Sequence, residues 1–319
     1  MSDISPSRAY IRIENKDYWT RLKKSIKEHR YIYLLVLPSL VYLIIFYYLP
    51  IYGIQLAFKD YNIAKGIWGS QWVGLRHFKL LMADSDFWFA FRNTIVISLQ
   101  RLAVSFPIPI ILAIVLNEVR EGAFKRVLQT IYTFPHFLSW LVISGIILNI
   151  FSSAGVINNF LAMLGFERQM FLAQPALFRP LLYFLANWKE SGWSAIIFLA
   201  TISGINPELY EAAIVDGANR WHKIIHITWP SIATTVVILF ILSLGGVMDA
   251  GFDQIFVLQN PLVREVADII DTYLYRITFD SAPDFGFSAA IGLFRSLINF
   301  ILLYVSNFLV KRVVGWSLF

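Results

Sequence analysis

Cysteine is absent from this sequence of 319 residues, and charged residues are scarce. Without thiols the chain can form no disulfide, no zinc–cysteine site and no cysteine nucleophile. The Gly-Lys dipeptide is also missing, which excludes the phosphate-binding loop that ends in Gly-Lys-Ser or Gly-Lys-Thr. Only 15% of the residues are charged, whereas soluble domains carry about 25%. This deficit argues against a soluble protein.

Hydrophobic residues replace the missing charge. They make up 57% of the chain, and aromatic residues alone make up 16%, with 27 Phe and 10 Trp. Aromatic side chains are common at the lipid-facing and interfacial surfaces of membrane proteins. The composition therefore indicates an integral membrane protein.

Long apolar stretches set the fold class. A helix needs about 20 apolar residues to cross the hydrocarbon core of a bilayer. We therefore expect an all-α membrane domain over residues 31–319 with six transmembrane helices. The expected spans are 31–58, 93–117, 127–152, 180–205, 230–258 and 287–310. The fourth should be broken at 188–192, where Lys189 and Glu190 interrupt the apolar run.

The positions of Lys and Arg predict the orientation, because cytoplasmic loops carry an excess of both. Basic residues crowd the segment 1–30, and Lys311 and Arg312 flank the last span. Others lie between the second and third spans: Arg120, Lys125 and Arg126. We therefore expect both termini in the cytoplasm. The net charge of +6 then reflects topology and does not indicate nucleic-acid binding.

The segment 1–30 is expected to stay on the cytoplasmic side. Apolar residues such as Trp19 and Leu22 accompany a lysine-rich face. This pattern is typical of an amphipathic helix on the inner membrane surface. A basic tail without a helix explains it equally well.

The segment 206–230, between the fourth and fifth spans, has its own pattern. Asn206 can cap a helix, Pro207 suits the first helical turn, and Glu208 favours the positive end of the helix. Good helix formers follow until Gly217, which permits a turn at the end of the helix. A second short helix then leads to the fifth span. The sequence thus predicts two cytoplasmic helices joined at a glycine.

This segment resembles the signature of permeases from binding-protein-dependent ABC importers. The signature is Glu-Ala-Ala, three residues, Gly, nine residues, and then Ile-x-Leu-Pro. At those spacings the chain has Glu211-Ala212-Ala213, Gly217 and Ile227-Thr228-Trp229-Pro230, with Trp229 in place of the usual Leu. Asp216-Gly217-Ala218 is typical of the carbohydrate branch.

Further stretches resemble the branch that imports oligosaccharides released from polysaccharides. They are Trp72-Val73-Gly74-Leu75, Asn93-Thr94, Phe134-Pro135-His136-Phe137, Gly251-Phe252-Asp253-Gln254 and Ala290-Ile291-Gly292-Leu293-Phe294. The resemblance implies a type I importer fold in a bacterial inner membrane. Known substrates of the branch include alginate-type and pectin-type oligosaccharides, so an acidic oligosaccharide is the expected substrate.

The resemblance also implies partners. They are a second homologous permease, two cytoplasmic ATPases and an extracytoplasmic solute-binding protein, besides membrane lipid. ATP and Mg²⁺ would bind to the ATPases, and this chain would bind no cofactor and catalyse no reaction. The residues expected to couple to an ATPase are Glu211, Ala212, Ala213, Asp216, Gly217 and Ala218.

Polar residues in or near the spans are candidates for the substrate path, because charge in a bilayer is costly unless it faces a cavity or a protein partner. A sugar presents both hydroxyls and C–H faces, which suits hydrogen-bonding groups beside aromatic rings. The candidates are Asn187, Trp188, Asp249, Phe252, Asp253 and Gln254. Arg101 and Arg295 would suit an acidic oligosaccharide, or alternatively a phospholipid or the second permease.

Other interpretations remain open at this point. His222 and His226 have the spacing of zinc ligands, but no obvious third ligand accompanies them, which favours packing or a surface role. The chain could import a neutral sugar or glycerol phosphate. A secondary transporter would need an ion-coupling site and usually repeated halves, and neither is visible. An enzyme acting on lipid-linked sugar would need clustered acids. The acids of 265–284 more simply suit a loop that docks the solute-binding protein.

Overall fold

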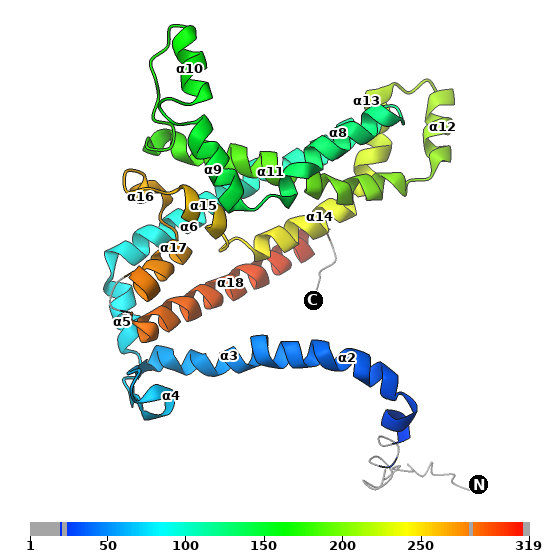
Figure 1. Ribbon diagram of the computed structural model, residues 1–319. Coiled ribbons are helices and arrows are strands. Elements are labelled where there is room, and N and C mark those ends of the chain that lie inside the picture. Colours follow the sequence, from blue (N-terminus) through cyan, green and yellow to red (C-terminus); the bar gives the residue numbers. More distant parts are fainter. Residues whose placement is uncertain (1–19, 21–23, 281–282, 315–319) are drawn as a thin grey trace, which may run out of the picture. The chain divides into compact units, whose positions relative to one another are not determined.

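The computed structural model describes residue 20, residues 24–280 and residues 283–314 (Figure 1). The chain divides into two compact units, Met1–Gln55 and Leu56–Phe319. Most of the amphipathic helix predicted within the segment 1–30 lies outside the described residues. The helices of each unit are described in turn below, because they supply the functional side chains.

The first unit is built from apolar helix. α2 (Arg30–Leu43) continues into the π-helical turn η1 (Ile44–Tyr48), then α3 (Leu49–Ile51) and the 3₁₀ segment η2 (Tyr52–Phe58), which runs into the second unit. η1 lies just before Pro50, whose missing N–H removes one helical hydrogen bond and loosens the turn. The run Arg30–Phe58 is long and apolar enough to cross a membrane, as predicted.

The second unit begins with a small hairpin. β1 (Lys59–Asp60) pairs antiparallel with β2 (Gln71–Trp72) around α4 (Gly66–Gly69), and α5 (Arg76–Ala83) follows. α6 (Ser85–Ser105) and α7 (Pro107–Glu118) form one apolar stretch of 34 residues. Asp84 caps α6 by accepting the backbone N–H of Asp86 at 2.8 Å. This stretch contains the second predicted span.

The third predicted span is not straight. α8 (Ala123–Thr133) runs into the 3₁₀ turn η3 (Phe134–Phe137), and α9 (Trp140–Ile150) then departs at 102°. Pro135 lies in the turn, and Ser139 caps α9 by accepting the N–H of Val142 at 3.3 Å. A proline followed by a cap restarts the helix in a new direction. α10 (Val156–Met163) follows.

The predicted break in the fourth span is wrong. α11 (Pro175–Ser203) is one helix of 29 residues that runs through the whole stretch 188–192. Lys189 is 5% exposed, and its Nζ lies 2.9 Å from Glu190 and 2.8 Å from the His136 carbonyl oxygen. The charge is thus neutralised within the protein. Gly192 lets the backbone of Tyr132 approach closely, because a Cβ there would lie 2.0 Å from its carbonyl oxygen.

The segment 206–230 forms the two predicted helices. α12 (Pro207–Val215) is capped by Asn206, which accepts the N–H of Glu208 at 3.1 Å. α13 (Arg220–Lys223) is capped by Asn219, and the π-helical turn η4 (Ile224–Thr228) leads into α14 (Trp229–Gly245). Like η1, this turn lies just before a proline, Pro230.

The fifth span ends earlier than predicted. Helix α14 stops at Gly245, and α15 (Phe252–Leu258) is a separate short helix. Gly251 between them has φ +86°, a left-handed conformation that glycine adopts readily. The guanidinium of Arg101 also packs against it, so that a Cβ at this position would lie 1.8 Å from Nη1. The predicted continuous span 230–258 is therefore wrong beyond Gly245.

The last part of the chain returns to a long helix. α16 (Arg264–Ala267), α17 (Ile270–Tyr275) and the π-helical turn η5 (Arg276–Asp280) precede α18 (Phe285–Val314). Asp284 accepts the N–H of Phe287 at 2.8 Å at the start of α18. α18 packs along α14 (Figure 1).

By length and composition, four helical stretches among the described residues can cross a membrane, or five if the bent pair α8–α9 is one span. Their buried side chains gather in separate clusters. One joins α9, α11 and α15, another joins α6, α17 and α18, and the last joins α7, α11 and α14. α11 contributes to two of these clusters and packs against α6, α7, α8, α14 and α16, so it is the central helix of the second unit. The all-helical fold class is confirmed.

Candidate functional site

The turn after α12 has the geometry that its glycine predicts. Gly217 has φ +78°. Its N–H donates to the Ile214 carbonyl at 3.0 Å, and the Ala218 N–H donates to the Ala213 carbonyl at 2.8 Å. This pair of bonds is the Schellman motif, which satisfies the last carbonyls of a helix and turns the chain away. α12 therefore ends sharply before α13 begins.

The surface of α12 is open. None of its side chains is buried. The large exposed apolar residues of α12 and α13 are Leu209, Ile214, Val215 and Trp221. A group of exposed apolar side chains marks an interaction surface. The six residues predicted to couple lie on α12 or in its final turn, and none is buried: Glu211, Ala212, Ala213, Asp216, Gly217 and Ala218.

One hydrogen bond connects this surface to the base of α14. Tyr210 Oη lies 2.9 Å from Thr228 Oγ1, and Thr228 is only 1% exposed. A displacement of α12 would therefore be felt where the apolar helix α14 begins. His222 and His226 lie on α13 and η4 with their ring centroids 6.0 Å apart.

Three neighbouring cavities lie among the helices of the second unit. The first, about 490 Å³, is lined by α6, α7, α11 and α14 and contains Arg101. The second, about 750 Å³, lies between the segment 249–253, α17, η5 and α18, and contains Arg295. The third, about 470 Å³, is lined by α9, α11 and α15. Asp249 lines the first and second cavities, while Trp140 and Asp253 line the second and third. The three are thus adjacent.

Two arginines hold the segment that separates the first two cavities. Arg101 on α6 donates through Nη1 to the Ala250 carbonyl at 3.2 Å. Arg295 on α18 donates through Nη2 to the Met248 carbonyl at 3.3 Å. Arg295 Nη1 also lies 2.6 Å from Asp271. Burial raises the pKa of Asp271, and the nearby Arg295 guanidinium opposes that increase. Both arginines are therefore engaged within the protein.

A comparison with known families identifies the chain. Residues 105–315 match the model of the family described as "Binding-protein-dependent transport system inner membrane component". The chain belongs to this family. It is thus a permease, an integral protein of the inner membrane and a translocation subunit with no catalytic reaction of its own.

Similar proteins extend the match over nearly the whole permease. It is 40% identical to the polygalacturonan/rhamnogalacturonan transport system permease protein YteP of Bacillus subtilis, over 94% of each chain. It is also 40% identical to protein LplB of Bacillus subtilis, over 92% of this chain and 93% of the relative. The predicted resemblance to carbohydrate import permeases is confirmed.

A solved structure supports the same family. A chain of a bacterial alginate ABC transporter, in complex with its alginate pentasaccharide-bound periplasmic protein, aligns with a TM-score of 0.84 at 36% identity. The alignment covers 93% of this permease and 100% of that chain. The permease therefore has the fold of a type I importer.

The structure brings some of the predicted path residues together. Those that line the three cavities are Arg101, Asp249, Phe252, Asp253 and Arg295. Gln254 instead is 1% exposed and donates to the Leu182 carbonyl at 2.8 Å. Asn187 donates to the Tyr183 carbonyl at 2.8 Å, and neither it nor the exposed Trp188 lines these cavities.

Sequence reasoning missed several residues of the second cavity. They are Trp140, Asp271, Leu274, Tyr275, Thr278, Phe279 and Ser288. A usable signal was present for Tyr275 and Phe279, because aromatic residues four positions apart share one face of a helix. The sequence points less clearly to Asp271 as a cavity residue, because the sequence analysis places its carboxylate in an external loop.

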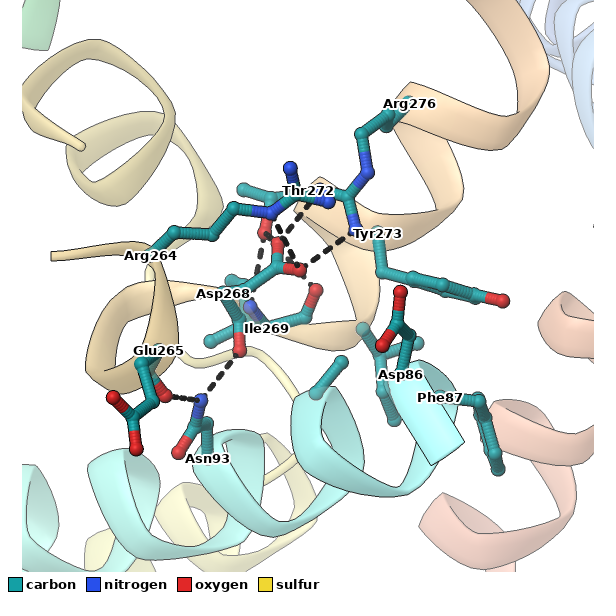
Figure 2. A network of polar contacts seen from close by, with 12 residues as sticks. Asp86, Phe87, Asn93, Arg264, Glu265, Asp268, Ile269, Thr272, Tyr273 and Arg276 are labelled. Atoms are coloured by element: carbon teal, nitrogen blue, oxygen red, sulfur yellow. Dashed lines mark hydrogen bonds and ion pairs between the residues drawn. The ribbon is translucent and has the colours of Figure 1, made fainter. Parts of the chain in front are cut away.

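The acidic stretch before α18 is internal at its centre (Figure 2). Asp268 is 8% exposed and accepts hydrogen bonds from both terminal nitrogens of Arg276, at 2.8 and 3.1 Å. Asn93 of α6 donates to the carbonyls of Glu265 and Asp268 at 2.8 and 3.0 Å. Asp268 and Asp271 therefore pair with arginines inside the protein and do not present free carboxylates at the surface, while docking by the remaining acids of 265–284 stays a prediction.

The same network reaches α11. Arg179 donates to the Val266 carbonyl at 3.0 Å and to Asn93 Oδ1 at 2.8 Å. The backbone N–H of Ile270 donates to Thr94 Oγ1 at 2.9 Å. The segment that carries α16 and α17 is thus fastened to both α6 and α11. This fastening sets the position of the wall of the second cavity.

Replacing Arg276 with alanine should destabilise the permease strongly, because the buried carboxylate of Asp268 loses its bidentate partner. Removing one member of a buried ion pair costs about 3–5 kcal/mol. Arg264 is a matched control, since it approaches the same carboxylate at 3.8 Å but its side chain is 50% exposed; its removal should cost about 1 kcal/mol or less. Thermal unfolding of the purified complex measures both. Equal melting temperatures for the two variants would contradict this account.

Proposed function

We propose that this permease imports oligosaccharides, and in particular acidic fragments of polysaccharides. The observation that carries the proposal is its 40% identity, over 94% of both chains, to a permease named for polygalacturonan and rhamnogalacturonan transport. The similarity to the alginate transporter chain adds support, because alginate is itself an acidic polysaccharide. Adjacent cavities lined by aromatic rings and hydrogen-bonding groups suit a sugar chain.

We further propose the assembly in which it works. An extracytoplasmic solute-binding protein delivers the oligosaccharide, and a second homologous permease supplies the other half of the path. Two cytoplasmic ATPases bind ATP and Mg²⁺, while this chain binds no cofactor. The exposed surface of α12 supports contact with an ATPase through the segment 206–230, and the bond between Tyr210 and Thr228 would carry its movement to α14.

The proposed topology has six spans with both termini in the cytoplasm. Five correspond to the stretches that can cross a membrane when the bent pair α8–α9 is counted once. The remaining span, which is the fourth in chain order, is α11, whose 29 residues would extend about 43 Å at 1.5 Å per residue. Its charges are compatible with a membrane because Lys189 pairs internally. Residues 1–30 then form a cytoplasmic segment and residues 31–319 the membrane domain, in contact with lipid.

The experiment that tests the substrate uses the complete importer in proteoliposomes with its solute-binding protein. We expect oligogalacturonides or alginate oligomers to stimulate ATP hydrolysis and to accumulate inside, and neutral oligosaccharides of equal length to do so less. Stimulation by neutral sugar or glycerol phosphate alone would overturn the acidic assignment. Solute accumulation that persists without ATP would indicate a secondary transporter.

A further inference from the structure

The second cavity combines an aromatic surface with an excess of carboxylates over basic groups. We propose that it is a sugar-binding site that takes the uncharged, hydroxyl-bearing face of a sugar ring and disfavours a carboxylate. The proposal rests on the proposed function, since it assumes that a sugar enters this path. It differs from the sequence-based hypothesis, in which Arg101 and Arg295 attract an acidic group.

The aromatic surface belongs to a continuous strip of four rings, Phe252, Phe256, Tyr275 and Phe279, of which all but Phe256 line the second cavity. The ring centroids of successive members lie 5.2, 4.6 and 5.1 Å apart. Phe252 and Phe256 lie four residues apart on α15, and Tyr275 and Phe279 lie four residues apart where α17 continues into η5. This spacing places the two rings of each pair on the same face. The strip thus extends from α15 across to η5, where Phe279 is 66% exposed. The C–H face of a pyranose can lie against such rings, while Trp140 lines the same cavity.

The charges of the cavity do not balance. Its charged lining residues are Asp249, Asp253, Asp271 and Arg295. Arg295 and Asp271 neutralise each other at 2.6 Å. Asp249 accepts the Gly251 N–H at 3.3 Å, and within the described residues Asp253 has neither a hydrogen bond nor an ion pair. The lining thus has three carboxylates against one guanidinium. Asp253 has no partner among the described residues, whereas the positive charge of Arg101 also acts on Asp249.

The other basic groups nearby lie outside this cavity. Arg101 lines the first cavity, where it donates to the Ala250 carbonyl and its positive charge acts on Asp249. Lys189 lines the third cavity and pairs with Glu190. Nor does a metal ion provide the missing charge, because the described residues contain no group of three acidic, His or Cys side chains that could hold one.

The chemistry of carboxylates decides which sugar face fits. An ionised carboxylate only accepts hydrogen bonds, so Asp249 and Asp253 require donors such as sugar hydroxyls. A uronate carboxylate beside them would add a like charge, which opposes binding. An acidic oligosaccharide would then pass with its hydroxyl faces toward this wall, and its carboxylates would be recognised elsewhere in the importer.

The lack of cysteine in the chain provides a direct test of the charge. A Phe279→Cys variant places the only thiol of this chain on the exposed end of the strip. In the assembled importer, a cationic methanethiosulfonate reagent should react with it about ten-fold faster than an anionic one of similar size. Adding Asp249→Asn and Asp253→Asn should remove most of that preference. Asp60→Asn, at an exposed position in the hairpin, should leave it unchanged.

Protection of the same thiol tests sugar binding. A neutral oligosaccharide should slow the reaction of an uncharged maleimide about five-fold, and a uronate oligomer of equal length should protect less. Asp249→Asn with Asp253→Asn should bring the two sugars closer together. Tyr275→Ala should abolish protection, whereas Tyr275→Phe should retain it because the ring remains.

The outcomes are separable. Equal reaction with both charged reagents, or protection by the uronate that equals protection by the neutral sugar, would overturn the inference. The inference would also be overturned if neither the neutral sugar nor the uronate protected the thiol. If protection follows the expected pattern but the intact importer moves no oligosaccharide into proteoliposomes, the site stands and the proposed function fails.

Discussion

Importers that carry Gly217→Val should insert and assemble but lose oligosaccharide transport. Gly217 has φ +78°, where a β-branched residue is strained by about 1–2 kcal/mol relative to the right-handed conformation. Relief of that strain would break the two hydrogen bonds that close α12 and would shift the surface around Asp216 and Ala218. We expect transport and oligosaccharide-stimulated ATP hydrolysis to fall about ten-fold or more.

The matched control is Gly217→Asn, because asparagine tolerates the left-handed conformation far better than valine. It should retain most of the transport rate. Space is not the issue at this position, since no atom lies within 4 Å of a Cβ built on Gly217. If the valine and asparagine variants transport equally well, α12 and its turn do not couple ATP hydrolysis to transport.

Local signals explain why the sequence alone predicts α12 so well. Asn206, Pro207 and Gly217 each act on the backbone within three residues of their own position. The structure places all of them as expected. Apolar runs also predict five of the stretches that can cross a membrane, when the bent pair α8–α9 is counted once, because span length depends on bilayer thickness. The fourth predicted span, α11, is not among these stretches.

Breaks within the spans were harder to predict, because their causes are long-range. Hydropathy continues past Gly245, but the chain turns where the guanidinium of Arg101 meets Gly251. In α11 the opposite error arose. Lys189 reads as an interruption, yet it pairs with the neighbouring Glu190 and with a carbonyl of His136, 53 residues earlier in the chain. The distant contacts, of Arg101 with Gly251 and of Lys189 with His136, cannot be identified from local sequence.

The candidate substrate path is also hard to predict, because it too depends on residues that are distant in sequence. Asp249 and Asp253 were predicted to line it, and they do line adjacent cavities. The arginines were expected to be free for an acidic substrate, but backbone carbonyls and Asp271 engage them. Their roles depend on how α6 and α18 pack around the segment 246–251. That packing brings together residues that are far apart in sequence.

The second large effect is expected for Arg295→Ala. The variant leaves Asp271 unpaired, with a side chain that is only 12% exposed, and it frees the Met248 carbonyl. An uncompensated buried charge costs about 3–5 kcal/mol. We therefore expect a clear drop in melting temperature and a loss of transport of about ten-fold or more for every substrate.

Arg92→Ala is the control, because Arg92 is exposed on α6 and should tolerate the change. The double variant Arg295→Met with Asp271→Leu separates the two roles of Arg295. It removes both charges and should recover thermal stability, as replacing a buried ion pair by apolar residues often does. Transport should stay low, because Met248 still lacks its donor and the wall between the first two cavities is no longer held from α18. If thermal stability and transport both recovered in the double variant, Arg295 would serve only to balance the charge of Asp271. It would then not be needed to hold the segment 246–251 in position.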